Sequence, residues 1–142
     1  MVEKDNVLLP DKVLVASNKD SEPREVSVET LGKEDCIYDI SPLYIDSIKK
    51  PFAEAKTIIW NGPMGFFEED KFSSGTKAVA GQISESEAYS VIGGGDTIAA
   101  AAQARVLDSI NYVSTAGGAF LNYLEGKPLP ALLALEEKTL ES

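Results

Sequence analysis

Three glycine-containing turns carry the residues of this sequence that are best suited to chemistry. They lie at 60–63 (WNGP), 93–97 (GGGDT) and 114–118 (STAGG). Each turn follows a short apolar stretch that is typical of a buried strand, and the second and third lead directly into helical patterns. Because the carboxyl ends of parallel strands lie at one edge of a sheet, we expect the turns to share the edge where open α/β folds bind ligands.

The second turn has the features of a phosphate-binding site. Glycines let the backbone approach a ligand closely and adopt positive φ. The helix predicted from Thr97 onward presents unpaired N–H groups and the positive end of its dipole. A carboxylate at Asp96 would repel phosphate unless Mg²⁺ lies between them. Spacing alone leaves two interpretations of Asp96 evenly matched, a magnesium ligand or a carboxylate that merely caps the helix.

The other two turns offer further candidates. Gly117 and Gly118 stand at a second helix start, and two such starts facing one crevice would stabilise the charge of a transferring phosphoryl group. The alternative is a tight packing turn. Asn61 could donate its amide to a phosphate or close its own turn, and spacing favours the turn. Glu68 could accept hydrogen bonds from ribose hydroxyls or be a solvated loop carboxylate. The turns at 93–97 and 114–118 match neither the GxxxxGK[ST] phosphate loop nor the GxGxxG dinucleotide pattern.

Composition excludes several other chemistries. The 142 residues carry a net charge of −10 and no histidine. The lack of histidine removes the usual general base and zinc ligand, and the negative charge disfavours nucleic acid and anionic membranes as partners. The single cysteine, Cys36, cannot form an internal disulfide, which favours a reducing, cytoplasmic location. Its residue type predicts a small buried side chain.

The elements that must position the turns alternate along the chain. Apolar or alternating stretches predict strands at 12–17, 25–30 (as a half-exposed strand or hairpin arm), 36–40, 57–60, 89–92 and 111–114. Helical patterns lie at 42–52 with an interruption at Pro51, and at 75–83, 97–107 and 119–124. This alternation predicts an α/β fold of three αβα layers with a mainly parallel, Rossmann-like sheet. In the absence of a repeat or linker, we expect residues 1–142 to form one domain.

The three turns together resemble motifs of the phosphoglycerate kinase family in order and approximate spacing. WNGPMGFFE at 60–68, GGGDT at 93–97 and STAGGAFLNYLEGKPLP at 114–130 carry the resemblance, and NVLLPDKVLVA at 6–16 and DISP at 39–42 match more weakly. The resemblance implies that residues 1–142 are the C-terminal part of the family's nucleotide-binding domain, and so a partial domain. It also implies reversible phosphoryl transfer in glycolysis between 1,3-bisphosphoglycerate with ADP and 3-phosphoglycerate with ATP, with Mg²⁺ as cofactor.

The resemblance implies roles for individual residues. Those that would bind the nucleotide or its phosphates are Asn61, Gly62, Pro63, Glu68, Gly94, Gly95, Asp96, Thr97 and Thr115. Asp96 would be the metal ligand. Gly94, Gly117 and Gly118 would take part in catalysis by stabilising the transferred group.

The sequence also departs from the family. Ala116 replaces the first of three glycines that are usual in the late turn, Ser41 replaces the glycine of DIGP, and Phe120 stands where a small residue is usual. No lysine or arginine lies in the three turns, and the family's substrate domain and lysine-bearing motif are missing. Phosphoryl transfer depends on positioning and charge neutralisation, so we expect negligible turnover from the isolated chain.

Three interpretations therefore remain open: a piece of the kinase, a nucleotide-binding module without catalysis, and an interaction fragment whose site has decayed. The expected partners are a nucleotide and the missing N-terminal part of the enzyme if it is supplied separately. A parallel sheet cut through its middle would also expose apolar surface, which predicts self-association of the isolated chain.

Overall fold

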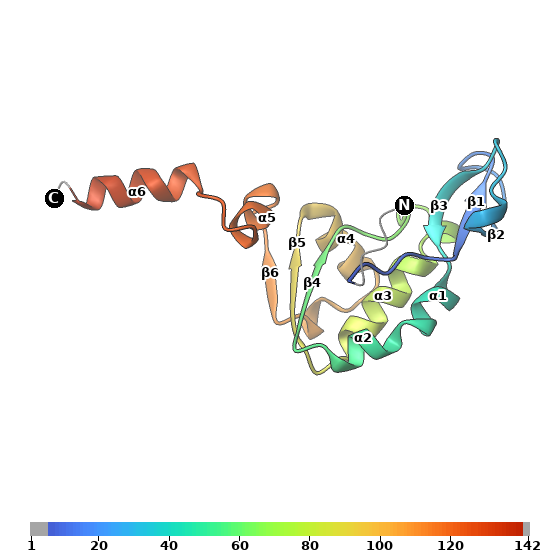
Figure 1. Ribbon diagram of the computed structural model, residues 1–142, viewed down its shortest axis with the longest axis horizontal. Coiled ribbons are helices and arrows are strands. Elements are labelled where there is room, and N and C mark those ends of the chain that lie inside the picture. The colour runs from blue at the N-terminus through green and yellow to red at the C-terminus, as the bar shows by residue number, and fades with distance from the viewer. Residues whose placement is uncertain (1–5, 141–142) are drawn as a thin grey trace.

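The computed structural model describes residues 6–140, which contain two separate three-stranded sheets (Figure 1). The strand orders are β2-β1-β3 and β4-β5-β6. In chain order the elements are β1 (Lys12–Ala16), β2 (Arg24–Ser27), η1 (Val28–Thr30), β3 (Cys36–Ile40), α1 (Pro42–Ser47), α2 (Lys49–Glu54), β4 (Thr57–Asn61), η2 (Asp70–Phe72), α3 (Ser74–Glu85), β5 (Tyr89–Gly93), α4 (Gly95–Gln103), η3 (Leu107–Ser109), β6 (Tyr112–Ser114), α5 (Gly118–Leu124) and α6 (Pro130–Leu140).

The second sheet is parallel and confirms the predicted α/β class. β5 pairs with β4 on one side and β6 on the other, both in parallel register. Helices α3 and α4 make the two crossover connections. Trp60 and Ile92 stand side by side on one face of this sheet and are almost fully buried against Val79 and Ile83 of α3 and Ala101 of α4. The hydrophobic core therefore lies between this face and the helices.

The first sheet is antiparallel, a separate unit that the strand–helix alternation did not predict. β1 is its central strand, with β2 and β3 antiparallel on either side and a register shift between Leu14 and Val15. The strand expected at 25–30 ends at Ser27, whose hydroxyl accepts a hydrogen bond from the Glu29 amide and starts a 3-10 turn. The expectation for Cys36 is wrong, because this residue is exposed at the start of β3.

Ser41, the departure from the family's DIGP pattern, has a structural role. Its side chain is fully buried and accepts a hydrogen bond from the Leu43 amide, which caps α1. Its hydroxyl also donates to Glu25, and this hydrogen bond holds the pKa of the Glu25 carboxyl below its ordinary value. The serine therefore joins β2 to the start of α1.

Proline and backbone conformation determine where the helices end. The interruption predicted at Pro51 is confirmed and falls at Ile48, between α1 and α2, because a proline tolerates only the first turn of a helix. The boundaries predicted for α4 are wrong. This helix begins at Gly95 and ends at Gln103, and Arg105 follows with a positive φ of 59°.

Within residues 6–140, no helix combines the length and apolar character needed to cross a bilayer.

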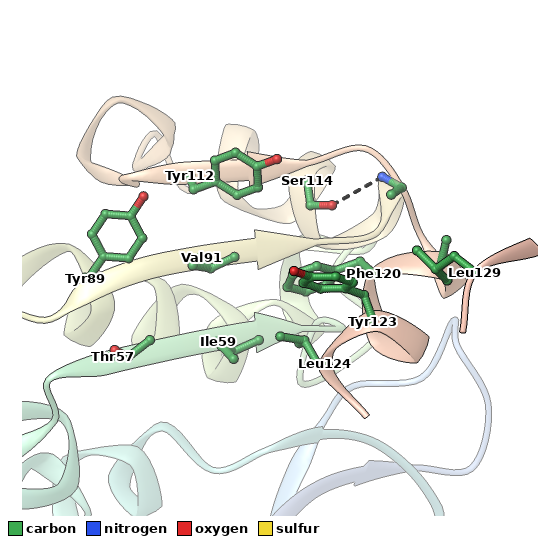
Figure 2. A pocket seen from close by; sticks show the side chains of 12 residues that line it. Thr57, Ile59, Tyr89, Val91, Tyr112, Ser114, Phe120, Tyr123, Leu124 and Leu129 are labelled. Carbon is green, nitrogen blue, oxygen red and sulfur yellow. Dashed lines mark hydrogen bonds between the residues drawn. The ribbon is translucent and has the colours of Figure 1, made fainter. Parts of the chain in front are cut away.

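The other face of the parallel sheet is open. Strand register places Thr57 beside Tyr89, and Val91 between Ile59 on one neighbouring strand and Tyr112 on the other. Ile59, Tyr89 and Tyr112 are 48%, 54% and 54% exposed. Side chains of α5 lie over the carboxyl end of this face (Figure 2), and α6 extends away from the rest of the molecule (Figure 1). The third layer of the αβα fold is thus present only in part, as expected for a partial domain.

Candidate functional site

The first two turns are tied together at the carboxyl edge of the parallel sheet. The Asn61 side-chain nitrogen donates to the Gly93 carbonyl at 2.7 Å, and the Gly62 amide donates to the Thr97 hydroxyl oxygen at 2.7 Å. Strand register places Asn61, Gly93 and Ser114 at one level across the three strands. The turns therefore meet at one edge, as the strand pattern predicts.

Asn61 bridges two strands and does not close its own turn, so the interpretation that spacing favoured is wrong. The indole nitrogen of Trp60 closes that turn by donating to the Gly62 carbonyl at 2.8 Å. Gly62 has a φ of 98°, a conformation that suits glycine. Asn61 remains exposed at the edge of the sheet.

The third turn reaches the same edge through Phe120. A Cβ atom added to Gly93 would lie 2.4 Å from Cδ1 of Phe120 and 3.3 Å from the Asn61 side-chain nitrogen. Figure 2 shows the Phe120 ring over the ends of β4 and β5. The Ala116 amide donates to the Ser114 hydroxyl at 3.3 Å. Among residues 6–140, Arg105 is the only non-glycine residue with positive φ, so the methyl group of Ala116 introduces no backbone strain.

The first turn of α4 is open to a ligand. Gly94 is its N-cap residue, with φ 93° and ψ 142°, and no side chain caps the helix. Asp96 is exposed in the first turn, so the interpretation of Asp96 as the capping group is wrong. A Cβ on Gly95 would meet no atom within 4 Å. The amides at this helix start, together with the helix dipole, form an arrangement that favours phosphate.

Thr97 and the residues of the third turn differ in their exposure. Thr97 is 1% exposed, and its hydroxyl oxygen is occupied by the Gly62 amide. Thr115 and Gly118 are exposed, and Gly117 is half-buried with a φ of 52°. Thr97 therefore orients the first turn, and its direct contact with a nucleotide stays a prediction, as do the roles of Thr115, Gly117 and Gly118.

The loop between Gly62 and Glu68 is held from two sides. The amides of Met64 and Gly65 donate to the Thr76 hydroxyl of α3, at 3.1 and 3.3 Å. The Phe66 amide donates to the Tyr38 carbonyl of β3 at 2.7 Å. Pro63 is half-buried and Glu68 is exposed on this loop. Their contact with a nucleotide stays a prediction.

Asp39 is a buried carboxylate beneath this loop that sequence reasoning missed. It is 1% exposed and accepts hydrogen bonds from the amides of Gly75 (2.7 Å) and Ile40 (2.9 Å) and from the Ser74 hydroxyl (3.2 Å). Burial raises the pKa of the Asp39 carboxyl, and these hydrogen bonds act in the opposite direction. The only signal in the sequence is its place in DISP, because a carboxylate in a short strand ordinarily faces water.

The carboxylate of Asp96 suits a magnesium ion that is bound together with a nucleotide. Among the described residues, no group of three histidine, cysteine, aspartate or glutamate side chains could hold a metal ion by itself. Asp96 is the one carboxylate within the turns at 60–63, 93–97 and 114–118. Mg²⁺ in phosphate-transfer sites is commonly held by one or two carboxylates together with substrate phosphates and water. Asp96 beside the amides of α4 fits that requirement.

A groove of about 550 Å³ lies on the open face of the sheet, away from Asp96. Figure 2 shows its walls, which are Thr57, Ile59, Tyr89, Val91, Tyr112, Ser114, Ala116, Ala119, Phe120, Tyr123, Leu124 and Leu129. Most of these side chains are apolar, and both faces of parallel sheets are ordinarily covered by helices. We therefore interpret the groove as a packing surface rather than as the nucleotide site.

An open α/β sheet with glycine turns and an uncapped helix start at its carboxyl edge defines a class of proteins that bind phosphate-containing ligands there. Comparison with known proteins narrows this class. Residues 1–127 match the family model for phosphoglycerate kinase. The chain belongs to the phosphoglycerate kinase family.

Individual relatives agree with this assignment over part of their length. The chain is 46% identical over 140 residues to a phosphoglycerate kinase of Desulfosudis oleivorans and 43% identical over 145 residues to one of Psychrobacter cryohalolentis, covering 94% of this chain and 34% and 36% of those proteins. The solved phosphoglycerate kinase of Coxiella burnetii superimposes with a TM-score of 0.81 at 44% identity, over 88% of this chain and 33% of that one. That of Pyrococcus horikoshii gives 0.75 at 34% identity, over 89% and 32%. The chain thus spans about a third of the length of the relatives that it matches.

Proposed function

We propose that this chain supplies part of the MgADP and MgATP site of a phosphoglycerate kinase, for phosphoryl transfer between 1,3-bisphosphoglycerate and ADP. One observation carries the proposal: Asn61 and Gly62 are hydrogen-bonded to Gly93 and Thr97 across the sheet edge. These bonds bring the WNGP turn to the open start of α4. The family to which the chain belongs supports the reaction.

Each group has a distinct task in this proposal. The amides of Gly94 and Gly95 and the α4 dipole bind the phosphates, and Asp96 holds the metal. Magnesium bound with the nucleotide neutralises charge that builds up during transfer. Pro63 and Glu68 orient the nucleoside from the adjoining loop. The late turn, with Thr115, Gly117 and Gly118, stabilises the transferred group.

The isolated chain binds the nucleotide in this proposal but does not turn it over. The turns contain no lysine or arginine, and cations that clamp the transferring group ordinarily supply much of the rate enhancement. The part of the relatives' length that this chain does not match, if supplied as a separate polypeptide, would bring these cations and bind the acidic substrate. Measurable magnesium-dependent conversion of ADP by the purified chain would contradict this. We propose a cytoplasmic location on the basis of the enzyme family and the single, unpaired thiol.

The test of the site is the magnesium dependence of ADP binding in Asp96→Asn. Because the carboxylate holds the metal, we expect MgADP to bind about tenfold more weakly. ADP in the presence of EDTA should bind equally well or better, because a charge that repels phosphate is removed. Titration calorimetry measures both affinities.

Asp108→Asn is the matched control, because it makes the same charge change in η3. This 3-10 turn precedes β6 and so lies at the amino end of that strand, away from the glycine turns. The Asp108→Asn variant should leave both affinities unchanged. An equal loss of ADP affinity with and without magnesium in Asp96→Asn would contradict the proposal that Asp96 binds the metal. If the unaltered chain binds no MgADP, the alternative of an interaction fragment with a decayed site gains support.

We further propose that the isolated chain self-associates through the open face of the parallel sheet. Exposed apolar surface of this kind ordinarily seeks a covering partner, and for the isolated chain that partner is a second copy. Light scattering should detect dimers or larger species, and Ile59→Lys should shift the chain toward monomer. Ile37→Lys is the matched control, since Ile37 is 56% exposed on the other sheet. A stable monomer before any substitution would contradict the proposal.

A further inference from the structure

The buried carboxylate of Asp39 lies outside the phosphate-binding turns, yet it contacts the elements that hold them. We infer that Asp39 is a positioning residue that fixes Gly65 and the first turn of α3, and thereby sets the place of Pro63 and Glu68 in the nucleotide site. The inference rests on the proposed function and assigns a role within the same site.

The surroundings of the Asp39 side chain require a hydrogen-bond acceptor at both of its oxygen positions. Two backbone amides, those of Gly75 and Ile40, point at different oxygens of the carboxylate. A backbone N–H cannot act as an acceptor, so both oxygens must accept. An asparagine would place its NH₂ group against one of these amides and leave a buried donor without a partner. The position therefore requires an aspartate.

The carboxylate is also in direct contact with the loop and the helix. A Cβ on Gly65 would lie 2.3 Å from Oδ1 of Asp39, and a Cβ on Gly75 would lie 2.4 Å from the same atom. Only glycine lets the backbone approach the carboxylate so closely at these two points. Asp39 thus stands between residue 65 of the loop and residue 75 of α3 and determines their separation.

The first turn of α3 passes this constraint on to the loop. Ser74 and Gly75 donate to Asp39, while the next residue, Thr76, accepts hydrogen bonds from the amides of Met64 and Gly65. Thr76 is 2% exposed, and its hydroxyl oxygen accepts from both of these amides. A shift of the α3 start would therefore displace the loop between Gly62 and Glu68.

The chain contains its own spectroscopic reporter of this loop. Trp60 is the only tryptophan, is 3% exposed, and donates its indole N–H to the Gly62 carbonyl at the start of the loop. A change in loop position alters this hydrogen bond and with it the fluorescence of Trp60. A general loss of stability does not change the emission of molecules that remain folded.

The experiment compares Asp39→Asn with the unaltered full chain under conditions where circular dichroism shows both to be folded. Trp60 emission should shift, and amide exchange at Met64, Gly65 and Phe66 should become about tenfold faster. Exchange at Ile92, in the centre of the parallel sheet, should not change. MgADP should bind about fivefold more weakly, because the loop is misplaced.

Asp35→Asn is the matched control. Asp35 also accepts a hydrogen bond from a backbone amide, that of Gly32, but it lies in a surface loop and pairs with Arg24. This variant should leave Trp60 emission, loop exchange and MgADP affinity unchanged. If Asp39→Asn does not fold, Ser74→Ala replaces it, since this variant removes one of the three hydrogen bonds to the carboxylate and should speed loop exchange by about threefold.

The outcomes separate this inference from the proposed function. Unchanged emission and loop exchange in the folded variant overturn the positioning role, even if the unaltered chain binds MgADP. Unchanged MgADP affinity together with a loosened loop overturns the link to the site. If the unaltered chain binds no MgADP, the proposed function fails, and the fluorescence and exchange measurements still decide whether Asp39 positions the loop.

Discussion

Gly75→Ala should destabilise the protein by about 3 kcal/mol, whereas Gly81→Ala in the same helix should stabilise it by about 0.5–1 kcal/mol. Both positions lie in α3, Gly75 in its first turn and Gly81 in its interior, and the helix preference of alanine acts in the same direction at both. The difference lies in their surroundings. A Cβ on Gly75 would lie 2.4 Å from Oδ1 of Asp39 and 2.7 Å from the Ile40 carbonyl oxygen, while a Cβ on Gly81 would meet nothing within 4 Å.

The size of the effect follows from what would have to move. The Ile40 oxygen belongs to the backbone of β3, and the Asp39 carboxylate is held by three hydrogen bonds. Neither can rotate away as a flexible surface side chain would, so the strain falls on the packing of β3 against α3. Urea denaturation followed by circular dichroism measures both variants. A Gly75→Ala variant as stable as Gly81→Ala would show that β3 and α3 do not pack as described.

Gly94→Ala and Gly95→Ala should distinguish the effect of backbone strain on stability from the effect of a methyl group on the approach of a ligand. Gly94 has φ 93° and ψ 142°, a conformation that costs a residue with a side chain about 2 kcal/mol. We expect Gly94→Ala to lower both stability and MgADP affinity. Gly95 lies in the open first turn of α4, where a Cβ meets no protein atom, so Gly95→Ala should fold as stably as the unaltered chain.

In Gly95→Ala the expected loss is in binding alone. If the amides of this turn contact the nucleotide's phosphates, a methyl group beside them should weaken MgADP binding by about tenfold. Thermal unfolding without ligand measures the stability of both variants, and calorimetric titration measures their affinity. Gly81→Ala, remote from the edge, is the control for the effect of adding a methyl group to a helix. If Gly95→Ala binds MgADP normally, the phosphates do not approach the start of α4.

One face of the parallel sheet is left open by the described residues. Ile59, Tyr89 and Tyr112 are about half exposed on this face, whereas the opposite face packs tightly on α3 and α4. The chain spans about a third of the length of its relatives. We therefore expect nucleotide affinity to increase when a covering polypeptide holds the three turns rigidly.

Much of the fold and of the site could be predicted from local pattern. The strands at 57–60 and 89–92 and the turns that follow them are apolar runs ending in glycine, and such runs depend on neighbouring residues only. Parallel pairing then requires the turns to meet at one edge. The limits of α4 could not be predicted, because Arg105 ends that helix with a positive φ in a run of residues with good helix propensity.

The side-chain partners within the site could not be predicted in the same way. The pattern favoured Asn61 closing its own turn and left Asp96 as a possible helix cap. In the structure, Asn61 bonds to Gly93, 32 residues away, and α4 has no side-chain cap. Both outcomes depend on which strand lies next to which, and this is a long-range property.

The sequence by itself determined which residues stand at the ends of the parallel strands, because glycine turns and apolar periodicity act over a few neighbouring positions. Only the tertiary structure decided that Asp39 is buried beneath the loop, that Thr97 holds Gly62, and that residues 12–40 form a separate sheet. These features arise from contacts between segments distant in the chain, where packing and hydrogen bonding outweigh the preference of a carboxylate or a hydroxyl for water.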